Sequence, residues 1–491
     1  MAATPRATSF VDVKREQLTP LDAAFLELEQ ADECSHMHIG WAMVFDPLPG
    51  NVPSIEDVRA LLDRRLDAMP RFRKRLSHPH TGGLRWPHWE TDPHFDIAGH
   101  VRRATLPSPG GDTELLDWLS DFYSHRLDRH RPLWEITLLD GLSSGRWSLV
   151  TKVHHSLVDG VSGVSVTNLL LDDSPAPSPA GDAARSAPTP AASAHETGRP
   201  PLVRGLRAGI DLALHPGRIR DLLGQASGLA KFIVRDEVIP APHTSLNVPI
   251  GGNRRMTFVT APLADLKAIK SRLGGSVNDV VLAIAAGGLR HLLETRREPL
   301  PERGVRVMVP VNVRRATEMM ALGNRVSSLF VELPVAESDA LGRYRATVEA
   351  TEALKRSGLA GGAEALMDVA GAVPPVLHAA LARLAFTPRL FNLTITNVPG
   401  PQTTLYALGA PMRRVIPLVP IFANHAVGFA VVSYDGEVVF SLNGDHGAMA
   451  DLDVLGEGLE RSLDELRAIV GLPTGESLRP PDTVEAALRP A

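Results

Sequence analysis

The sequence predicts an α/β protein with two lobes. The chain has 491 residues, a length that favours more than one domain or one large two-lobed unit. Strand patterns and helical patterns occur together in both halves, as is typical of a mixed α/β architecture. Between the halves, residues 174–202 are rich in Pro, Ala and Ser. Because this segment has almost no large apolar side chain, we interpret it as a disordered linker that follows an N-terminal lobe of residues 1–173.

In the N-terminal lobe, stretches with strand composition accompany a clear helical pattern. The predicted strands are HIGWAMVFD, WEITLLDGL and RWSLVTKVHH. Ser54, followed by acidic residues, predicts the start of a helix over SIEDVRALLDRRLDAM. The third predicted strand ends in two adjacent histidines, His154 and His155.

Residues 203–240 form a segment of a different kind. Between Ile219 and Ile233, apolar residues recur at helical spacing, and Arg and Lys residues flank them. This pattern fits a crossover helix that packs on one lobe. It also fits an interfacial helix that rests on a lipid surface with its basic side toward the headgroups. The sequence leaves both interpretations open.

The C-terminal lobe is predicted to span residues 241–475, before a flexible tail at 476–491. The stretch VNDVVLAIAAGGLRHLLETRR is apolar on most sides and predicts a buried helix. Strands are predicted for RVMVPVNVR, SSLFVELP and LFNLTITNVPG. The stretch FAVVSYDGEVVFSLNGD predicts a hairpin that turns at Asp435 and Gly436.

Composition and charge exclude several classes of function. The formal net charge is -5, so nucleic acid is not expected as a partner, because phosphate binding needs a basic face. Cys34 is the single cysteine, which excludes an internal disulfide framework and fits a reducing cytosol. No apolar signal core occurs near the N-terminus, and no stretch approaches the roughly 18 apolar residues of a membrane span. We therefore expect a cytoplasmic protein, soluble or peripheral.

The stretch KVHHSLVDG, residues 152–160, places two histidines at the end of a predicted strand and just before a predicted helix. Ligand chemistry gathers at such strand ends in open α/β sheets. A neutral imidazole accepts a proton from a hydroxyl at cellular pH. Asp159 can cap the helix or fix a neighbouring group, and Gly160 permits a tight chain reversal. Because His154 and His155 point to opposite faces of a strand, they form a poor metal pair.

A second histidine-containing stretch, ECSHMHIG, resembles a metal site in its spacing. Cys34, His36 and His38 alternate, so all three would face one side of a strand. The chain has no further cysteine to complete a thiolate site. We therefore expect no metal, and no motif calls for a cofactor.

The HHxxxDG pattern in HHSLVDG is the signature of the CoA-dependent acyltransferase superfamily, which includes chloramphenicol acetyltransferases and condensation domains. Further stretches, in order from about residue 18 to residue 445, resemble the bacterial wax ester synthase/diacylglycerol acyltransferase family. These stretches are LTPLDAAFLELE, MHIGWAMVFD, PRFRKRL, FDIAGHVRR, RPLWEITLLDGL, GSVNDVVLA, VPVNVR, GNRVSSLFVELP and TNVPGP.

The resemblance implies a fold of two chloramphenicol-acetyltransferase-like lobes, each a mixed sheet flanked by helices, with a central substrate channel. It implies that His155 is the general base, which takes the proton of an alcohol as its oxygen attacks the thioester of acyl-CoA. His154 would be its structural neighbour. Asp159 would structure the loop, and Gly160 would form its turn.

The resemblance also suggests supporting residues. Asn278 and Asp279 match a family block at a helix start, where helix capping is the simpler interpretation. Asn278 is a candidate for the oxyanion or for shaping the site. Trp134 belongs to the PLW block, where packing in the core is the favoured interpretation. Trp134, Asp279, Thr394 and Thr396 are candidate substrate-binding residues, and the two threonines also suit the strand in which they lie.

The resemblance predicts transfer of a long-chain acyl group from acyl-CoA to diacylglycerol, with long-chain alcohols as a further acceptor. Acyl-CoA is then a substrate rather than a cofactor. A peripheral membrane or lipid-droplet location follows, because acceptor and product partition into lipid. Two alternatives stay open: a condensation-type acyltransferase that uses a carrier-protein thioester, and a lipid-droplet binding protein without activity.

Overall fold

We analysed a computed structural model of the chain, and it describes residues 16–48, 52–81, 86–158, 170–176, 240–312, 326–357 and 375–475. Several features of the sequence lie outside these ranges. They are Asp159, Gly160, the helix expected after them, nearly all of the linker, nearly all of the 203–240 segment, and the tail.

The first of two large sheets has six strands in the order β12-β13-β2-β7-β6-β5. The strands are β2 (His38–Phe45), β5 (Val101–Thr105), β6 (Trp134–Asp140), β7 (Trp147–His154), β12 (Tyr406–Ala407) and β13 (Ala410–Leu418). β5 and β6 pair in parallel and the other neighbours are antiparallel. The alternation of HIGWAMVFD, WEITLLDGL and RWSLVTKVHH therefore predicted β2, β6 and β7 correctly.

The second large sheet also has six strands, in the order β10-β9-β11-β14-β15-β8. The strands are β8 (Arg254–Pro262), β9 (Val305–Asn312), β10 (Val326–Leu333), β11 (Leu393–Pro399), β14 (Val427–Tyr434) and β15 (Glu437–Asp445). β11 runs parallel to both of its neighbours, so this sheet is mixed as well. The predicted hairpin is confirmed: Tyr434 pairs with Glu437, and Asp435 and Gly436 have φ values of 44° and 83°.

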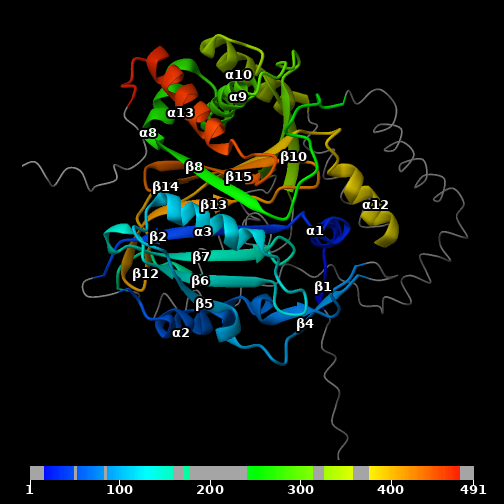
Figure 1. The fold of residues 1–491 in the computed structure, drawn as a ribbon, viewed down its shortest axis with the longest axis vertical. Helices are drawn as coiled ribbons and strands as arrows, with labels where there is room; N and C mark the ends of the chain where they lie inside the picture. The colour runs from blue at the N-terminus through cyan, green and yellow to red at the C-terminus, as the bar shows by residue number, and fades with distance from the viewer. Residues whose placement is uncertain are drawn as a thin grey trace, which may run out of the picture.

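Helices pack on the sheets, and α12 lies to one side, next to α1, as Figure 1 shows. They are α1 (Pro20–Ala31), α2 (Ile55–Arg65), α3 (Asp112–Ser124), α8 (Leu263–Leu273), α9 (Val277–Thr295), α10 (Ala340–Ser357), α12 (Pro375–Ala385) and α13 (Leu452–Ile469). Ser54 caps α2 through the N–H of Asp57, as the sequence predicts. α9 is buried on nearly every side from Asp279 to Leu289, which confirms the predicted buried helix. A small third sheet joins β1 (Glu16–Gln17), β4 (His88–Thr91) and β3 (Lys74–Leu76).

The two lobes are connected by a strand pairing and by side-chain contacts. β12 and β13 come late in the chain, yet they belong to the first sheet, because β13 pairs with β2 and β12 pairs with β13. The two sheets therefore do not divide the chain at a single point. The sequence did not predict this pairing, because local alternation identifies a strand but not its partner. α1 and α12 meet at the junction between the lobes, where His378 Nδ1 lies 2.7 Å from Glu27 Oε2.

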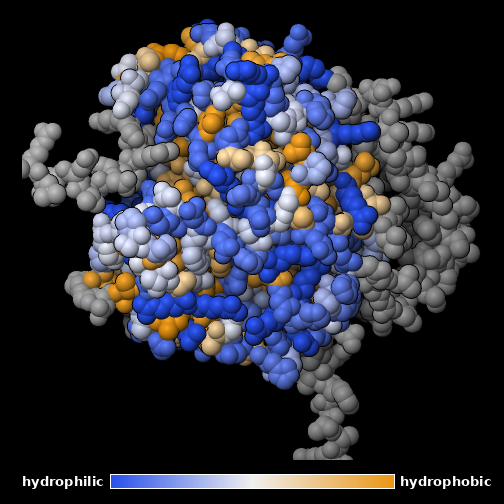
Figure 2. Space-filling model, viewed as in Figure 1, coloured by the Kyte–Doolittle hydropathy of each residue, from blue (hydrophilic) through white to orange (hydrophobic). Residues whose placement is uncertain are grey.

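None of the described helices is long and apolar enough to cross a membrane. On the face drawn in Figure 2, hydrophobic residues form small separate patches among hydrophilic ones. That face carries no continuous apolar surface.

Candidate active site

The two adjacent histidines lie where β7 ends. His154 is the last residue of the strand, and His155 begins the turn that follows. The turn is tied to its surroundings by backbone hydrogen bonds: His154 N–H donates to Leu133 C=O (2.9 Å) and His155 N–H donates to Met37 C=O (2.8 Å). Leu157 N–H donates back to His154 C=O (2.9 Å). Because His155 lies beyond the strand, strand alternation does not determine the direction of its ring.

His155 is the more accessible of the pair. It is half-buried, whereas His154 is 1% exposed. The His155 imidazole stacks on the phenyl ring of Phe25 in α1, with centroids 4.0 Å apart and planes 24° apart. A stacked aromatic neighbour fixes the plane of the imidazole.

His154 makes contacts that fit a structural neighbour of His155. Its Nδ1 lies 2.7 Å from Ser156 Oγ and accepts a hydrogen bond from the Ser156 N–H at 3.1 Å. Its Nε2 faces Glu29 Oε2 of α1 at 3.4 Å. The two histidines therefore contact residues one turn apart on the same helix, Phe25 and Glu29.

Glu29 lies at the centre of a buried charged cluster. Its Oε2 accepts hydrogen bonds from Arg129 Nη2 (2.6 Å) and Nε (2.9 Å), and Arg126 lies 3.5 Å away. Its Oε1 faces His38 Nε2 at 3.6 Å. Burial opposes ionisation of this carboxyl, but the contact with His154 and the positive charge of Arg129 outweigh it, so the pKa of Glu29 lies well below its usual value. Burial also lowers the pKa of His154 and of His38, which keeps both rings neutral.

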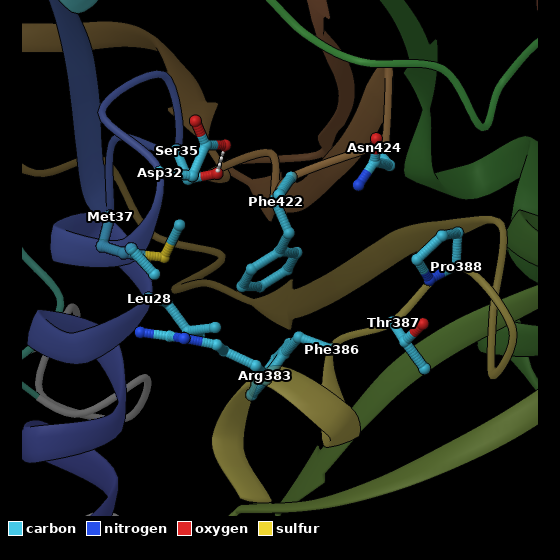
Figure 3. Close-up of a pocket in the computed structure, with 12 residues that line it drawn as sticks. Leu28, Asp32, Ser35, Met37, Arg383, Phe386, Thr387, Pro388, Phe422 and Asn424 are labelled. Carbon is cyan, nitrogen blue, oxygen red and sulfur yellow. Dashed lines mark hydrogen bonds between the residues drawn. The ribbon is translucent and has the colours of Figure 1, made fainter. Parts of the chain in front are cut away.

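A cavity of about 280 Å³ opens between the lobes. Figure 3 shows residues of α1 and of the loop before β2 on one side, and Thr387, Pro388 and Asn424 on the other. The residues that line it are Leu28, Ala31, Asp32, Ser35, Met37, Arg383, Phe386, Thr387, Pro388, Phe422, Ala423 and Asn424.

Two contacts place this cavity close to the histidine turn. Met37 lines the cavity and accepts the backbone hydrogen bond of His155. Phe386 also lines it, and its ring centroid is 6.5 Å from that of Phe25, the residue on which His155 stacks. Phe386 and Phe422 pack at 4.6 Å and belong to an apolar cluster that draws on both lobes. The cavity thus has an apolar wall next to His155 and polar groups toward Asp32 and Asn424.

The other predicted site residues fall into separate groups. Asp279 completes a capping box: its Oδ2 accepts from the Ser276 N–H and hydroxyl (both 2.7 Å), and its Oδ1 accepts from Thr351 Oγ1 (2.7 Å). These contacts account for Asp279 by helix capping. Asn278 is half-buried, and its Oδ1 accepts from Asn397 Nδ2 at 3.2 Å. The side-chain oxygen of Asn278 therefore points toward β11, and its side-chain NH₂ group can still donate a hydrogen bond.

The remaining predicted residues differ in their surroundings. Thr394 is 4% exposed, and its Oγ1 has no hydrogen-bond partner among the described residues. Thr396 Oγ1 lies 3.5 Å from the Phe429 carbonyl of the neighbouring strand. Trp134 is 1% exposed, donates from Nε1 to the Phe72 carbonyl (2.7 Å) and stacks on His100. Its contacts are those of a core residue.

The metal-like alternation in ECSHMHIG does not lie on one strand. β2 begins at His38, so Cys34 and His36 belong to the preceding loop, and the expectation that all three face one side of a strand is wrong. His36 Nδ1 lies 3.5 Å from the Tyr123 carbonyl, and the Cys34 carbonyl accepts a hydrogen bond from Arg254. In the described ranges, no three His, Cys, Asp or Glu side chains are arranged to hold a metal ion.

Sequence reasoning did not single out Phe25, Glu29, Arg129 or Met37. The signal for two of them was present in LTPLDAAFLELE, where Phe25 and Glu29 are spaced four apart on one helix. The residues that Phe25 and Glu29 contact, His155, His154 and Arg129, lie 100 or more positions further along the chain, so no local pattern predicts these contacts.

Comparison with known proteins links this arrangement to a family. Residues 18–281 match the profile of the wax ester synthase/diacylglycerol acyltransferase catalytic domain, and residues 322–467 match the C-terminal domain of the same family. The protein named probable diacylglycerol O-acyltransferase tgs1 of Mycobacterium tuberculosis is 32% identical over 456 residues, covering 92% of this chain and 96% of its own length. The protein named probable diacylglycerol O-acyltransferase tgs2 of the same species is 33% identical over 463 residues, covering 93% and 99%.

Solved structures show the same fold. The wax ester synthase/diacylglycerol acyltransferase from Marinobacter aquaeolei VT8 is 30% identical and superposes with a TM-score of 0.65, covering 93% of this chain and all of that one. A variant of the starter condensation domain of rhizomide synthetase RzmA, solved with C8-CoA and Leu-SNAC, is 14% identical with a TM-score of 0.57 and covers 96% of this chain and 97% of that one. The second likeness shows the fold alone, and it confirms the predicted two-lobed α/β class.

Proposed function

The chain belongs to the wax ester synthase/diacylglycerol acyltransferase family, and from that membership we propose that it moves a long-chain acyl group from acyl-CoA to diacylglycerol. Long-chain alcohols are a second acceptor class. The observation that carries the proposal is the position of His155: half-buried, stacked on Phe25, and close to the apolar wall of a cavity between the lobes.

We assign His155 as the general base. Its neutral imidazole takes the proton of the acceptor hydroxyl as the hydroxyl oxygen attacks the thioester carbonyl carbon. The carbon–oxygen bond forms and the carbonyl becomes a tetrahedral oxyanion. Collapse of this intermediate breaks the carbon–sulfur bond, and the imidazolium returns its proton to the CoA thiolate. The product is an ester, no acyl-enzyme is needed, and the base leaves the cycle neutral.

The cavity supplies an environment for an alkyl chain. Leu28, Met37, Phe386 and Phe422 present aliphatic and aromatic surface, and each methylene removed from water contributes about 0.8 kcal/mol. A chain of many methylenes therefore binds far better than an acetyl group, which favours a long-chain substrate.

Donors for the oxyanion are the second requirement of the mechanism. Asn278 is supported by its bond to Asn397, which occupies the carbonyl oxygen and leaves the NH₂ group for a ligand. Thr394 is supported by a buried hydroxyl without a partner in the described part of the chain. The roles of Asp159 and Gly160 in holding the loop stay predictions, as does association with a membrane or lipid-droplet surface.

One assay tests the proposal. Purified protein receives labelled palmitoyl-CoA with either diolein or hexadecanol, beside a His155→Ala variant. We expect ester with diolein, ester also with hexadecanol, and a loss of at least about 10²-fold in the variant. Equal product from His155→Ala would reject the base assignment. If neither acceptor gives product but a carrier-protein thioester does, the chain is a condensation-type enzyme instead, and lipid binding without any ester identifies a binding protein.

A further inference from the structure

Helix α1 contacts both histidines of the turn through residues one helical turn apart. Phe25 stacks on His155, and Glu29 faces His154. We infer that Glu29 is a positioning residue: its carboxylate, held by Arg129, fixes His154 as the tautomer protonated on Nε2, and this tautomer holds the turn that presents His155. The inference rests on the proposed function only in that it takes His155 as the base.

The contacts of His154 determine where its proton lies. The Ser156 backbone N–H can only donate, and it points at Nδ1 from 3.1 Å. Nδ1 must therefore carry the lone pair. In a neutral imidazole the proton then lies on Nε2, which faces the Glu29 carboxylate at 3.4 Å. The same Nδ1 also lies 2.7 Å from the Ser156 hydroxyl, so one ring nitrogen binds both polar groups of the residue that follows His155.

The Glu29 carboxylate is held firmly enough to select a tautomer. Arg129 grips Oε2 with two nitrogens, and its own Nη groups donate to the carbonyls of Leu26 (2.9 Å) and Pro79 (3.2 Å). An acceptor fixed in this way stabilises an N–H on the ring nitrogen that faces it. An Arg–Glu pair alone would satisfy the buried charge. Two histidines on paired strands, His38 and His154, nevertheless converge on the same carboxylate.

Glu27 provides a matched control on the same helix. It is 3% exposed, and its Oε2 lies 2.7 Å from Nδ1 of another buried histidine, His378. Its Oε1 accepts from Trp86 Nε1 at 2.9 Å. Glu27 thus resembles Glu29 in burial and chemistry, but its contacts go to α12 and to the loop before β4 rather than to the histidine turn.

The kinetic experiment compares Glu29→Gln with Glu27→Gln in the full-length protein. Because Arg129 can only donate, it holds the amide oxygen of Glu29→Gln at the position of Oε2, and this neutral oxygen is a weaker acceptor for the His154 Nε2–H than the carboxylate. The preference for the Nε2 tautomer therefore weakens, and the other tautomer sets an Nδ1–H against the Ser156 N–H. We expect Glu29→Gln to lower kcat by about 10- to 100-fold, with KM for palmitoyl-CoA unchanged within about twofold. Glu27→Gln should keep kcat within about twofold, and Glu29→Asp, which retains the charge, should recover part of the loss. A kcat for Glu29→Gln equal to that of Glu27→Gln overturns the inference.

A spectroscopic experiment tests the same inference without reference to activity. Nitrogen-15 NMR of histidine-labelled wild-type protein, with the His154 signals assigned by a His154→Gln variant, reports which ring nitrogen carries the proton. We expect protonation on Nε2 in the wild type and a shift toward Nδ1 in Glu29→Gln. Protonation on Nδ1 in the wild type overturns the inference even if no Glu29 variant folds. Full activity of His155→Ala with the expected tautomers would instead reject the proposed base and leave the Glu29–His154 relationship intact.

Discussion

Phe25 and His155 stack with their ring centroids 4.0 Å apart, although one lies near the start of the chain and the other follows β7. The proposed base is thus held by a helix rather than by its own loop alone. Phe25 is 6% exposed and also packs toward Phe386 beside the cavity. A single side chain therefore couples the orientation of the imidazole to the wall of the proposed acyl-chain site.

Replacing Phe25 by Leu should affect catalysis more than stability. The substitution keeps an apolar side chain and costs about 1 kcal/mol, but it removes the flat surface under the imidazole. Because a misplacement of about 1 Å can cost 10²-fold, we expect kcat to fall by at least about tenfold. Phe45→Leu is the control, since Phe45 stacks on Trp147 (4.4 Å) at the other end of β2. Equal kcat values in the two variants would show that the stack has no catalytic role.

Shortening Phe422 should change the preference for acyl-chain length. Phe422 is 5% exposed and lines the cavity, so Phe422→Ala lengthens the space available to an alkyl chain. Each additional methylene that the larger cavity covers contributes about 0.8 kcal/mol, or about fourfold in kcat/KM. The measurement is the ratio of kcat/KM for longer and shorter acyl-CoAs, which does not depend on the folded fraction. A ratio unchanged from wild type would place the acyl chain elsewhere.

Asn278 and Asp279 should respond differently to substitution despite being adjacent. Asp279→Asn weakens the capping box and the bond to Thr351, so we expect a loss of about 1–2 kcal/mol in the free energy of unfolding and a kcat within about threefold of wild type. Asn278→Ala removes the proposed oxyanion donor, and we expect kcat to fall by about 10²-fold with little change in stability. Denaturation curves and kcat for both variants provide the test. The reverse pattern would assign the catalytic part to Asp279.

Stability should decline in mild acid because of buried histidines. Burial lowers the pKa of His425 to about 4, against 6.5 for the ordinary group. Between those values the unfolded chain binds a proton that the folded protein does not, so stability is complete above pH 6.5 and falls as the pH drops toward 4. Urea denaturation at pH 7.5, 6 and 5 measures this slope. His425→Gln should give a shallower slope, and an unchanged slope would exclude His425 as a contributor.

Much of the fold follows from local sequence, and the reasons are physical. Strand alternation identified β2, β6 and β7, and the Asp435–Gly436 turn identified the β14–β15 hairpin, because period and turn chemistry are local properties. The pairing of β13 with β2 could not be predicted in this way. Strand partners are chosen by packing across the whole molecule, and no pattern in residues 410–418 specifies the other lobe.

In the candidate site, too, the local features could be predicted and the long-range contacts could not. The HHxxxDG motif predicted His155, because a motif places several chemical requirements in a few neighbouring positions. The Glu29 cluster escaped notice, since its members come from α1, β2, β7 and the loop after α3. From the sequence, a Glu in an amphipathic helix is expected to face solvent, whereas in the structure Glu29 is buried beside Arg129.

The pairing of β13 with β2 also bears on the order in which the protein can assemble during synthesis. β2, β7 and β6 leave the ribosome long before residues 410–418, so β2 has an unpaired edge during most of translation. An open edge of this kind attracts other strands and promotes aggregation. We therefore expect the nascent N-terminal portion to need a chaperone until Leu418 has emerged, and a chain truncated before β13 to be recovered mainly as insoluble material.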